Sequence, residues 1–322
     1  MSIVSTSISQ MAVLFSFIVI GFLLVKLKVL APDSSKVLAK LENNLFVPAL
    51  VLGTFCNHFT VEKISSASKL FLISCVVTVV FAILAWVISR FFTKDDFVRK
   101  ILTYGLAFSN FGFMGNAIVS ALFPDFFMDY LIFTLPLWTL IYLWGVPYLL
   151  IPSEDGKQTL KSNLKSLINP MFVAMVIGII IGLTSFTLPS WISSVVTVSG
   201  NCMSPVAMIL TGITLCNVDF KKTFTNATIY AVSFIRLIVF PLAVIGILYL
   251  IPQQIRTDFL GDSLIVCLVC SLAMPLGLSP IVIPAAYGKD TSVAAEMTIV
   301  SHILSVATIP LIFTIMTNIV SI

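Results

Sequence analysis

The chain has 322 residues, of which 59% are hydrophobic and 10% are charged, against roughly 45–50% and 25% in soluble domains. A mean hydropathy of +1.10 and 26 phenylalanines exclude a water-soluble fold, a disordered chain and a coiled coil. The formal net charge of +4 is too small to indicate nucleic-acid binding. The composition therefore predicts an all-α polytopic membrane protein.

Apolar runs separated by charged residues predict ten transmembrane helices. The last two runs are long for one membrane crossing, so we expect them to tilt, break or extend beyond the bilayer. The predicted spans, in chain order, cover residues 8–26, 36–57, 69–91, 99–122, 128–151, 168–185, 190–216, 225–251, 259–287 and 292–319.

Lysine and arginine are distributed very unevenly between alternate loops. One set of loops holds 14 of these residues, and the opposite set holds 3, namely Lys63, Lys69 and Arg256. Cytoplasmic loops carry the excess of positive charge. The count predicts a protein of the plasma or inner membrane with both termini outside the cytoplasm. It also places the polar segment Pro152 to Ser166 in the cytoplasm.

Similar motifs recur in the two halves of the chain, residues 1–151 and 168–322, which a linker at residues 152–167 joins. Five spans per half is an odd number, so a repeat between the halves is inverted in the membrane. The motifs that recur in the same order are Asn44 with Pro48 and Asn201 with Pro205, the glycine-rich centres of spans four and nine, and Thr134-Leu-Pro and Thr308-Ile-Pro.

Glycine and proline in the middle of spans four and nine predict two broken helices. Proline removes a backbone donor, and glycine weakens a helix interior. Irregular backbone at membrane depth is tolerated where protein or a water-filled cavity receives it, and paired broken helices mark transporter binding sites. We expect Ser279, followed by Pro280, to cap one restarted half-helix and Asn116 to cap the other.

Two motifs carry a family resemblance. Asn110-x-x-x-Met114-Gly115 in span four, and Ala273-x-Pro275-x-Gly277-x-x-Pro280 in span nine, resemble the crossover of the auxin efflux carrier family. Family members usually have proline two residues after the Met-Gly pair, where this chain has Ala117. The first break is therefore expected to depend on Gly112, Gly115 and Asn116.

The short linker makes the resemblance one to prokaryotic members of that family, which are proposed permeases for organic acids such as malate or malonate. The resemblance implies a scaffold of spans one, two, six and seven that forms a homodimer. It also implies a mobile transport domain of spans three to five and eight to ten, which moves as an elevator.

Candidate substrate-binding residues lie at the two breaks and beside the prolines of spans two and seven. Asn110 is the main candidate, and its alternative role is to join helices by hydrogen bonding. Asn44 and Asn201 bind either the substrate or backbone freed by the nearby prolines. The full set is Asn110, Gly112, Met114, Gly115, Asn116, Pro275, Gly277, Ser279, Pro280, Asn44 and Asn201.

Three ionisable residues inside the predicted spans are candidates for proton or charge coupling, because such residues are functional hypotheses by default. Arg236 and Glu296 are candidates for an ion pair, which either takes part in transport or is a static structural pair. His302 either carries protons or is a neutral residue between helices. The six cysteines, including Cys267-x-x-Cys270, are expected to serve in packing. His58 lies at the outer end of span two, so we do not expect it to share a metal site with His302.

The sequence thus predicts a secondary transporter for a small organic anion. Its expected partners are that anion, membrane lipid and a second copy, with no cofactor, metal or nucleic acid. The alternative is a sodium-coupled symporter of the bile-acid type, which needs hard oxygen ligands, yet neither break contains Asp or Glu. An intramembrane enzyme is disfavoured, since the chain has two histidines and no H-E-x-x-H motif. A passive channel is a further alternative.

Overall fold

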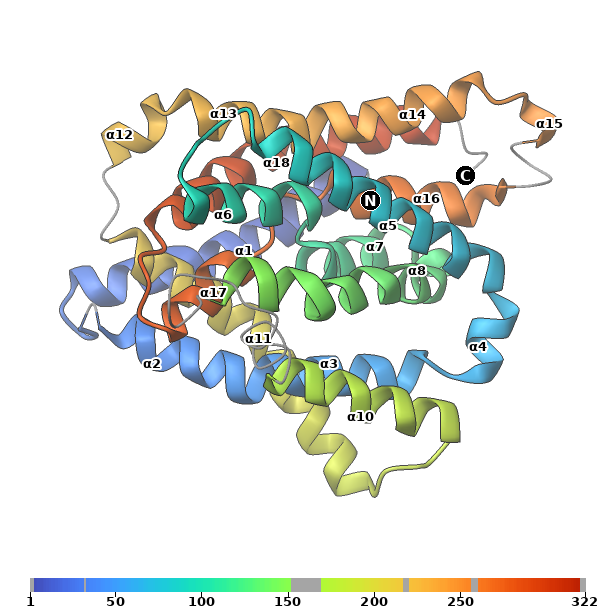
Figure 1. Cartoon of the computed structure of the whole chain (residues 1–322), viewed down its shortest axis with the longest axis horizontal. Coiled ribbons are helices and arrows are strands. Elements are labelled where there is room, and N and C mark those ends of the chain that lie inside the picture. The colour runs from blue at the N-terminus through green and yellow to red at the C-terminus, as the bar shows by residue number, and fades with distance from the viewer. Residues whose placement is uncertain (1–2, 32, 152–168, 217–219, 256–259, 319–322) are drawn as a thin grey trace.

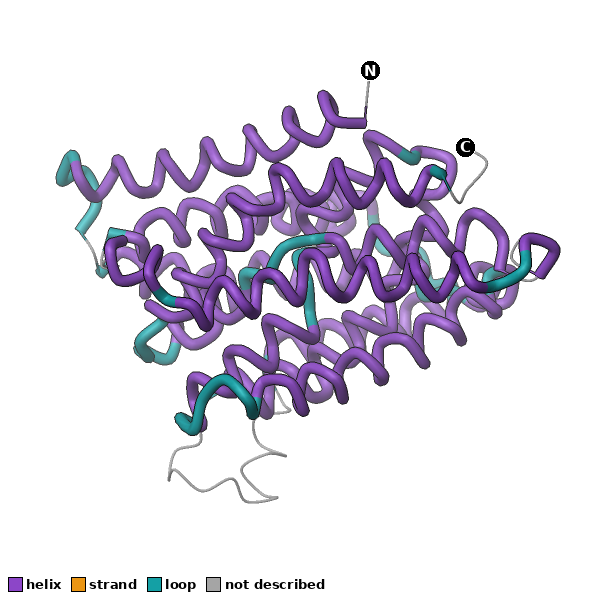
Figure 2. The backbone as a smooth tube through the Cα atoms, turned by 90° about the horizontal axis from the view of Figure 1, so that it is seen from above, coloured by secondary structure: helices purple, strands orange, loops and turns teal. Residues whose placement is uncertain are grey.

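The computed structural model of the chain describes residues 3–31, 33–151, 169–216, 220–255 and 260–318. Within these ranges every regular secondary-structure element is a helix. The described residues also contain one isolated antiparallel β-bridge, between Ser109 and Leu276. Figure 2 shows the helices running roughly alongside one another, with short connections at the two ends of the molecule. The expectation of an all-helical protein is confirmed.

The first half of the described chain contains α1 (Ile3–Lys26), α2 (Ser34–Leu41), η1 (Glu42–Phe46), α3 (Val47–His58), α4 (Val61–Ser66), α5 (Ser68–Ser89), α6 (Asp96–Ala107), η2 (Phe111–Gly115), α7 (Asn116–Leu122), η3 (Pro124–Phe126), α8 (Phe127–Leu140) and η4 (Ile141–Leu150). The second half contains α10 (Pro170–Thr184), α11 (Ser190–Leu215), α12 (Phe220–Thr225), α13 (Ala227–Phe234), η5 (Ile235–Val239), α14 (Phe240–Leu250), α15 (Gln253–Ile255), α16 (Gly261–Ala273), α17 (Ser279–Ala286) and α18 (Ser292–Thr317). Figure 1 labels most of these elements.

Five of the described helical segments are long and apolar enough to cross a membrane by themselves. They cover Ser68–Ser89, Pro124–Leu150, Ser190–Leu215, Ala227–Leu250 and Ser292–Thr317. Shorter apolar helices include Pro170–Thr184 and Gly261–Ala273. On α5, Leu72, Val76 and Ile83 are exposed, as expected for a face in contact with lipid. The chain is therefore a multi-pass membrane protein.

Three of the helical segments contain a wide turn directly beside a proline. The backbone N–H of Val47 donates to Glu42 just before Pro48, and that of Phe240 donates to Ile235 just before Pro241. The third, η4, contains Pro147. A proline lacks an N–H and clashes with the preceding turn, so the neighbouring turn widens to a five-residue spacing.

The helices form two bundles. The first bundle comprises α1, α2, η1, α3, α10 and α11, in which α1 packs on α11 and α3 packs on α10 and α11. Glycines permit these contacts: a side chain at Gly21 would meet the backbone of Ile209, and one at Gly212 would meet the backbone of Ile18. Small residues let membrane helices approach closely. The second bundle comprises α5, α6, α8, η4, α13, η5, α14, α16 and α18.

Candidate functional site: two crossing helix breaks

The predicted breaks in spans four and nine are both present. The helix α6 ends at Ala107, Phe108 is extended with φ −120° and ψ 114°, and the chain becomes helical again at η2 and α7. The helix α16 ends at Ala273, Met274 is extended with φ −71° and ψ 149°, and α17 begins five residues beyond Met274, at Ser279. Each break therefore separates two short half-helices.

The two breaks cross each other in the middle of the molecule. The N–H of Asn110 donates to the carbonyl of Pro275 at 2.7 Å, and the N–H of Gly277 donates to that of Phe108 at 3.4 Å. These bonds form the bridge between Ser109 and Leu276. In Figure 1, α6 and α17 lie toward one side of the crossing and α16 and α7 toward the other. The C-terminal ends of α6 and α16 thus meet at the same place as the beginnings of η2 and α17.

The first break lies earlier in the chain than expected. Gly112 and Gly115 belong to the wide helical turn η2, in which the N–H of Gly115 donates to the carbonyl of Asn110. The glycines serve close packing instead, since a side chain at Gly112 would meet the ring of Trp138 and one at Gly115 the hydroxyl of Tyr130. The prediction that the break depends on these residues was wrong in location.

Neither expected cap forms. Asn116 is the first residue of α7, its N-cap is Gly115 with no side-chain hydrogen bond, and the Asn116 Oδ1 atom is buried without a partner. The turn η2 already supplies the helical start, so no cap is needed at this position. Ser279 is likewise the first residue of α17, and the carbonyl of Leu278 receives the N–H groups of Ile281 and Val282.

Arg236 binds the carbonyl groups that the two breaks set free. Its Nη1 atom donates to Leu106 at 3.0 Å and its Nη2 atom to Ser271 at 3.3 Å. In an unbroken helix these carbonyls would receive the N–H groups four residues later. The N–H of Asn110 goes to Pro275 instead, and Pro275 has no N–H. Both half-helices present their negative ends here, so a cation is stabilised.

This arrangement corrects the expected pairing of Arg236 with Glu296. The guanidinium of Arg236 is 1% exposed and donates to the backbone carbonyls of Leu106 and Ser271. Glu296 lies buried on α18 at 7% exposure. The positive charge of Arg236 is therefore compensated by helix ends.

Two consecutive residues of α18 hold the two breaks. The Ser301 hydroxyl receives the N–H of Leu276 at 3.3 Å, in the second break. His302 contacts the first break, since its Nε2 atom lies 3.3 Å from the Asn110 Nδ2 atom. Its Nδ1 atom lies 2.8 Å from the carbonyl oxygen of Thr298, one turn earlier. The Oδ1 atom of Asn110 is buried without a partner.

Asn44 and Asn201 lie outside the crossing. Both are exposed, and the Asn44 amide donates to the carbonyl of Lys40 at 2.8 Å, one turn earlier in its own helix. The sequence analysis missed Asn43, the residue before Asn44. Its side-chain amide donates to the carbonyl of Val282 in α17 at 3.4 Å.

Glu42 was also missed, although it is a carboxyl group inside a predicted span. Its side chain is completely buried, and neither carboxyl oxygen has a hydrogen-bond partner. It lies on η1, which packs against α17. The rule that selected Glu296, an ionisable residue within an apolar span, selects Glu42 as well.

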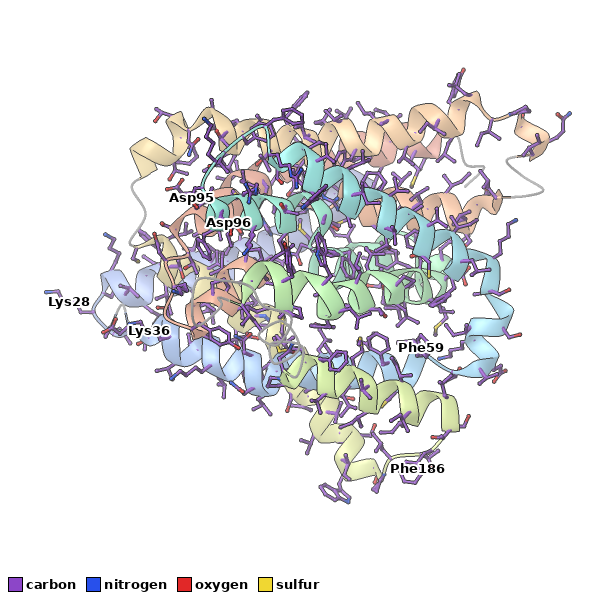
Figure 3. The ribbon with its side chains drawn as sticks, in the orientation of Figure 1. Lys28, Lys36, Phe59, Asp95, Asp96 and Phe186 are labelled. Atoms are coloured by element: carbon purple, nitrogen blue, oxygen red, sulfur yellow. The ribbon has the colours of Figure 1, made fainter. Side chains whose placement is uncertain are left out.

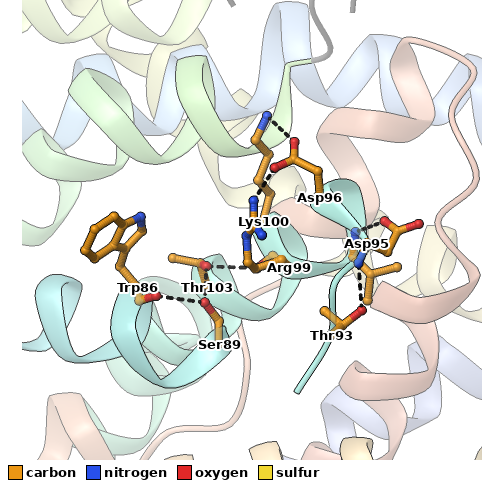
Figure 4. A network of polar contacts seen from close by, with 9 residues as sticks. Trp86, Ser89, Thr93, Asp95, Asp96, Arg99, Lys100 and Thr103 are labelled. Atoms are coloured by element: carbon orange, nitrogen blue, oxygen red, sulfur yellow. Dashed lines mark hydrogen bonds and ion pairs between the residues drawn. The ribbon is translucent and has the colours of Figure 1, made fainter. Parts of the chain in front are cut away.

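A polar network holds the beginning of α6, away from the crossing (Figure 4). Asp95 caps the helix by accepting the N–H of Val98 at 2.8 Å. A hydrogen bond from Lys100 lowers the pKa of the Asp96 carboxyl. Thr103 pairs with Ser89 of α5 at 2.7 Å. These contacts anchor the first half-helix to the second bundle.

A polar cavity of about 350 Å³ lies between the bundles at one end of the molecule. Lys36 of α2 and Thr214 of α11 line it from the first bundle, and Lys289 and Asp290 line it from the connection between α17 and α18. Figure 3 shows Lys36 at the same end as Lys28, Asp95 and Asp96.

The described residues contain no group of three or more His, Cys, Asp and Glu side chains that could hold a metal ion. Cys267 and Cys270 are buried free thiols within α16. His58 lies at the end of α3 and His302 within α18.

Two short half-helix pairs that cross inside a multi-pass bundle define a membrane transporter of the broken-helix class. The chain matches the family described as membrane transport protein over residues 6–313. It therefore belongs to this family, the auxin efflux carrier family. No curated protein matches the chain.

Proposed function

We propose that the protein is a secondary transporter for a small organic anion such as a carboxylate. The observation that carries this proposal is the crossing itself, where η2 begins directly after the buried Asn110 and α17 begins two residues after Gly277, which bonds to the first break. Backbone N–H groups at helix beginnings favour negative charge. No lysine or arginine occurs in residues 107–122 or 271–288, so backbone dipoles and neutral side chains are proposed to bind the anion. The candidate binding residues are Asn110, Gly112, Met114, Gly115, Asn116, Pro275, Gly277, Ser279 and Pro280.

The position of Arg236 argues against the alternative of a sodium-coupled symporter. A sodium ion at the crossing would need several oxygen ligands, and freed backbone carbonyls are the natural donors where carboxylates are lacking. The carbonyls of Leu106 and Ser271 already receive hydrogen bonds from the guanidinium. A fixed side-chain cation thus takes the role that a transported cation would have.

We propose that transport occurs by an elevator movement of the second bundle, with α7 and α17, against the first. The proposal is supported by the close contacts within the first bundle, which join α1 to α11 and α3 to α10. It is also supported by the similar division of both halves of the chain, since α6 and α7 correspond in order to α16 and α17. We propose that the halves are inverted repeats.

We propose that both termini lie outside the cytoplasm of a cell membrane. Figure 1 supports this topology, because α12 lies at one end of the molecule and α4 and α15 lie at the opposite end. The segment from Pro152 to Ser166 lies outside the described residues. A Lys157→Cys variant should be protected from an impermeant thiol reagent in intact cells and labelled after lysis. Labelling in intact cells would contradict the topology.

We propose a homodimer formed through the first bundle. Asn44 on η1 and Asn201 on α11 are exposed polar residues of that bundle, and polar side chains commonly join helices inside membranes. Mass measurement of the protein in nanodiscs should give twice the mass of one chain. An Asn44→Leu, Asn201→Leu double variant should shift the mass toward one chain.

Binding and transport of malonate and malate test the proposed function. Purified protein should bind at least one of these anions, and it should bind the neutral diamide of malonate much more weakly. Reconstituted protein should show saturable uptake and counterflow against a trans gradient, with and without sodium. Equal binding of acid and diamide would overturn the anion assignment, and unsaturable uptake would indicate a channel.

A further inference from the structure

The geometry points to His302 as a proton-binding positioning residue that sets which face of the Asn110 amide is offered to the anion. The transporter then takes up one proton with each anion. This inference rests on the proposed function and names its coupling ion. The argument depends on which atoms of the two side chains donate and which accept.

The bond to Thr298 determines the form of the imidazole in this structure. A carbonyl oxygen only accepts hydrogen bonds, so the Nδ1 atom that lies 2.8 Å from it carries the hydrogen. A neutral imidazole has one donor and one acceptor. The Nε2 atom therefore accepts, and the Asn110 Nδ2 atom, 3.3 Å away, donates to it.

Neutral His302 consequently leaves Asn110 turned the wrong way for an anion. One of the two amide hydrogens is used by the imidazole, so one N–H remains for the anion, and the Oδ1 atom, an acceptor, is buried without a partner. An unpaired carbonyl oxygen repels a carboxylate. The buried site in this state suits a hydrogen-bond donor better than an anion.

A proton on Nε2 reverses this preference. Both ring nitrogens of a protonated imidazole donate, so Nε2–H requires an acceptor, and the amide of Asn110 satisfies it by turning its Oδ1 atom toward the ring. Both N–H groups of the amide then face the site. The imidazolium adds a positive charge that is separated from the anion only by the Asn110 side chain. Hydrogen bonds that involve a charged group are stronger than those between neutral groups.

Among the described side chains, His302 is the titratable group within hydrogen-bond distance of the Asn110 amide. His302 itself contacts Thr298, Asn110 and, with ring centroids 6.4 Å apart, Phe15 of α1. Arg236 on η5 donates to backbone carbonyls. The titratable side chains on the helices packed against α18, and on α18 itself, are Lys26, Asp96, Arg99, Lys100, Tyr104, Cys202, Tyr230, Arg236, Tyr249, Asp262, Cys267, Cys270 and Glu296.

The position of His302 between the two bundles supplies a path for the proton. Phe15 belongs to the first bundle and covers the ring edge-on, at an interplanar angle of 81°. The relative movement proposed for the bundles would separate Phe15 from His302 and admit water. The Nε2–H bond forms with a proton from water on the side where the anion enters, and it breaks when the anion leaves on the other side.

Nuclear magnetic resonance of the histidine nitrogens tests the first part of the inference. The chain has two histidines, so a His58→Gln background makes His302 the sole labelled ring. In ¹⁵N-histidine-labelled protein without anion, at alkaline pH, Nδ1 should carry the hydrogen and Nε2 should not. Saturating malonate or malate, whichever binds, should protonate both nitrogens. The opposite tautomer at rest, or a ring unchanged by a bound anion, would overturn the inference.

The pH dependence of anion binding tests the coupling. In the wild type and in the His58→Gln control, the dissociation constant should rise about tenfold per pH unit once free His302 has lost its proton. In His302→Gln the side-chain amide can pair with Asn110 in either orientation, so binding should lose this slope. A wild type that binds either anion independently of pH would overturn the inference and leave the proposed function intact. Failure of both anions to bind at about pH 5 to 8 would overturn the proposed function and its coupling, and the resting tautomer would still be read separately.

Discussion

The two helix breaks are alike in geometry and different in cause. In the second break, Pro275 has no N–H, so the carbonyl of Ser271 loses its helical partner whatever surrounds it. The first break, at residues 108–110, contains no proline or glycine. It is held by distant groups, namely the carbonyl of Pro275 and the guanidinium of Arg236. One break is thus local in origin, and the other depends on the tertiary structure around it.

Replacing Arg236 with leucine should have the largest effect on this pair of breaks. It would leave the carbonyl of Leu106 without its donor, at about 1–3 kcal/mol for a buried group. The carbonyl of Ser271 would keep the hydrogen bond from the Ser109 hydroxyl. We expect a clear fall in the thermal unfolding temperature of the purified protein. Arg99→Leu is the control, because Arg99 forms a partly exposed ion pair with Asp96, worth about 0–1 kcal/mol. Equal unfolding temperatures for the two variants would show that the breaks hold without Arg236.

Replacing Asn110 with alanine should affect binding more than folding. The first break contains the side-chain amide of Asn110, whereas the second contains the apolar Leu276, which pairs with Ser109. We therefore expect the anion's polar contacts to depend on Asn110. Loss of one charge-assisted hydrogen bond costs roughly 1.5–3 kcal/mol, which is about tenfold or more in the dissociation constant. Isothermal titration with malonate and malate measures it. Asn116→Ala, at a half-buried position, should weaken binding less than Asn110→Ala does, and the reverse ranking would move the centre of the site toward α7.

Glycines at the two breaks should respond differently to an added methyl group. Alanine at Gly112 would meet the ring of Trp138, whereas alanine at Gly277 would lie 3.4 Å from the carbonyl oxygens of Phe108 and Ser109. Overpacking typically costs about 1–3 kcal/mol, so Gly112→Ala should lower the unfolding temperature more than Gly277→Ala. If Gly277→Ala proves the more damaging, the extended segments that cross are packed more tightly than the turn η2.

The local or tertiary origin of each break also explains what could be predicted from sequence. Pro275 and Pro280 indicate the second break directly, because proline has no backbone N–H and a fixed φ angle. Residues 108–110 contain neither proline nor glycine. The first break was therefore predicted from Gly112 and Gly115, a few residues after its actual position. The actual break is set by a hydrogen bond to a residue 165 positions later, which no local pattern contains.

The same distinction applies to the polar residues. Arg236, Glu296 and His302 were found because ionisable side chains are rare in apolar spans, and Glu42 satisfied the same rule. Their partners were not predictable. The guanidinium was expected to seek the carboxylate of Glu296, and it donates to carbonyls that exist as acceptors only because two distant helices break beside it.

Replacing Pro275 with alanine should have the smallest effect on stability and still impair transport. Alanine restores an N–H that can donate to the carbonyl of Ser271, in competition with the Ser109 hydroxyl at 2.6 Å and Arg236 at 3.3 Å. One hydrogen bond gained within α16 contributes about 1 kcal/mol, which offsets the contacts displaced. The extended helix would turn the carbonyl of residue 275 away from the N–H of Asn110, so the first break would lose the partner on which it depends. Malonate or malate uptake into proteoliposomes should therefore fall while the unfolding temperature changes little. Pro136→Ala in α8 is the control, because this buried proline lines a pocket with Phe59 and Phe71. Uptake by Pro275→Ala equal to that of the control would show that the first break does not depend on the second.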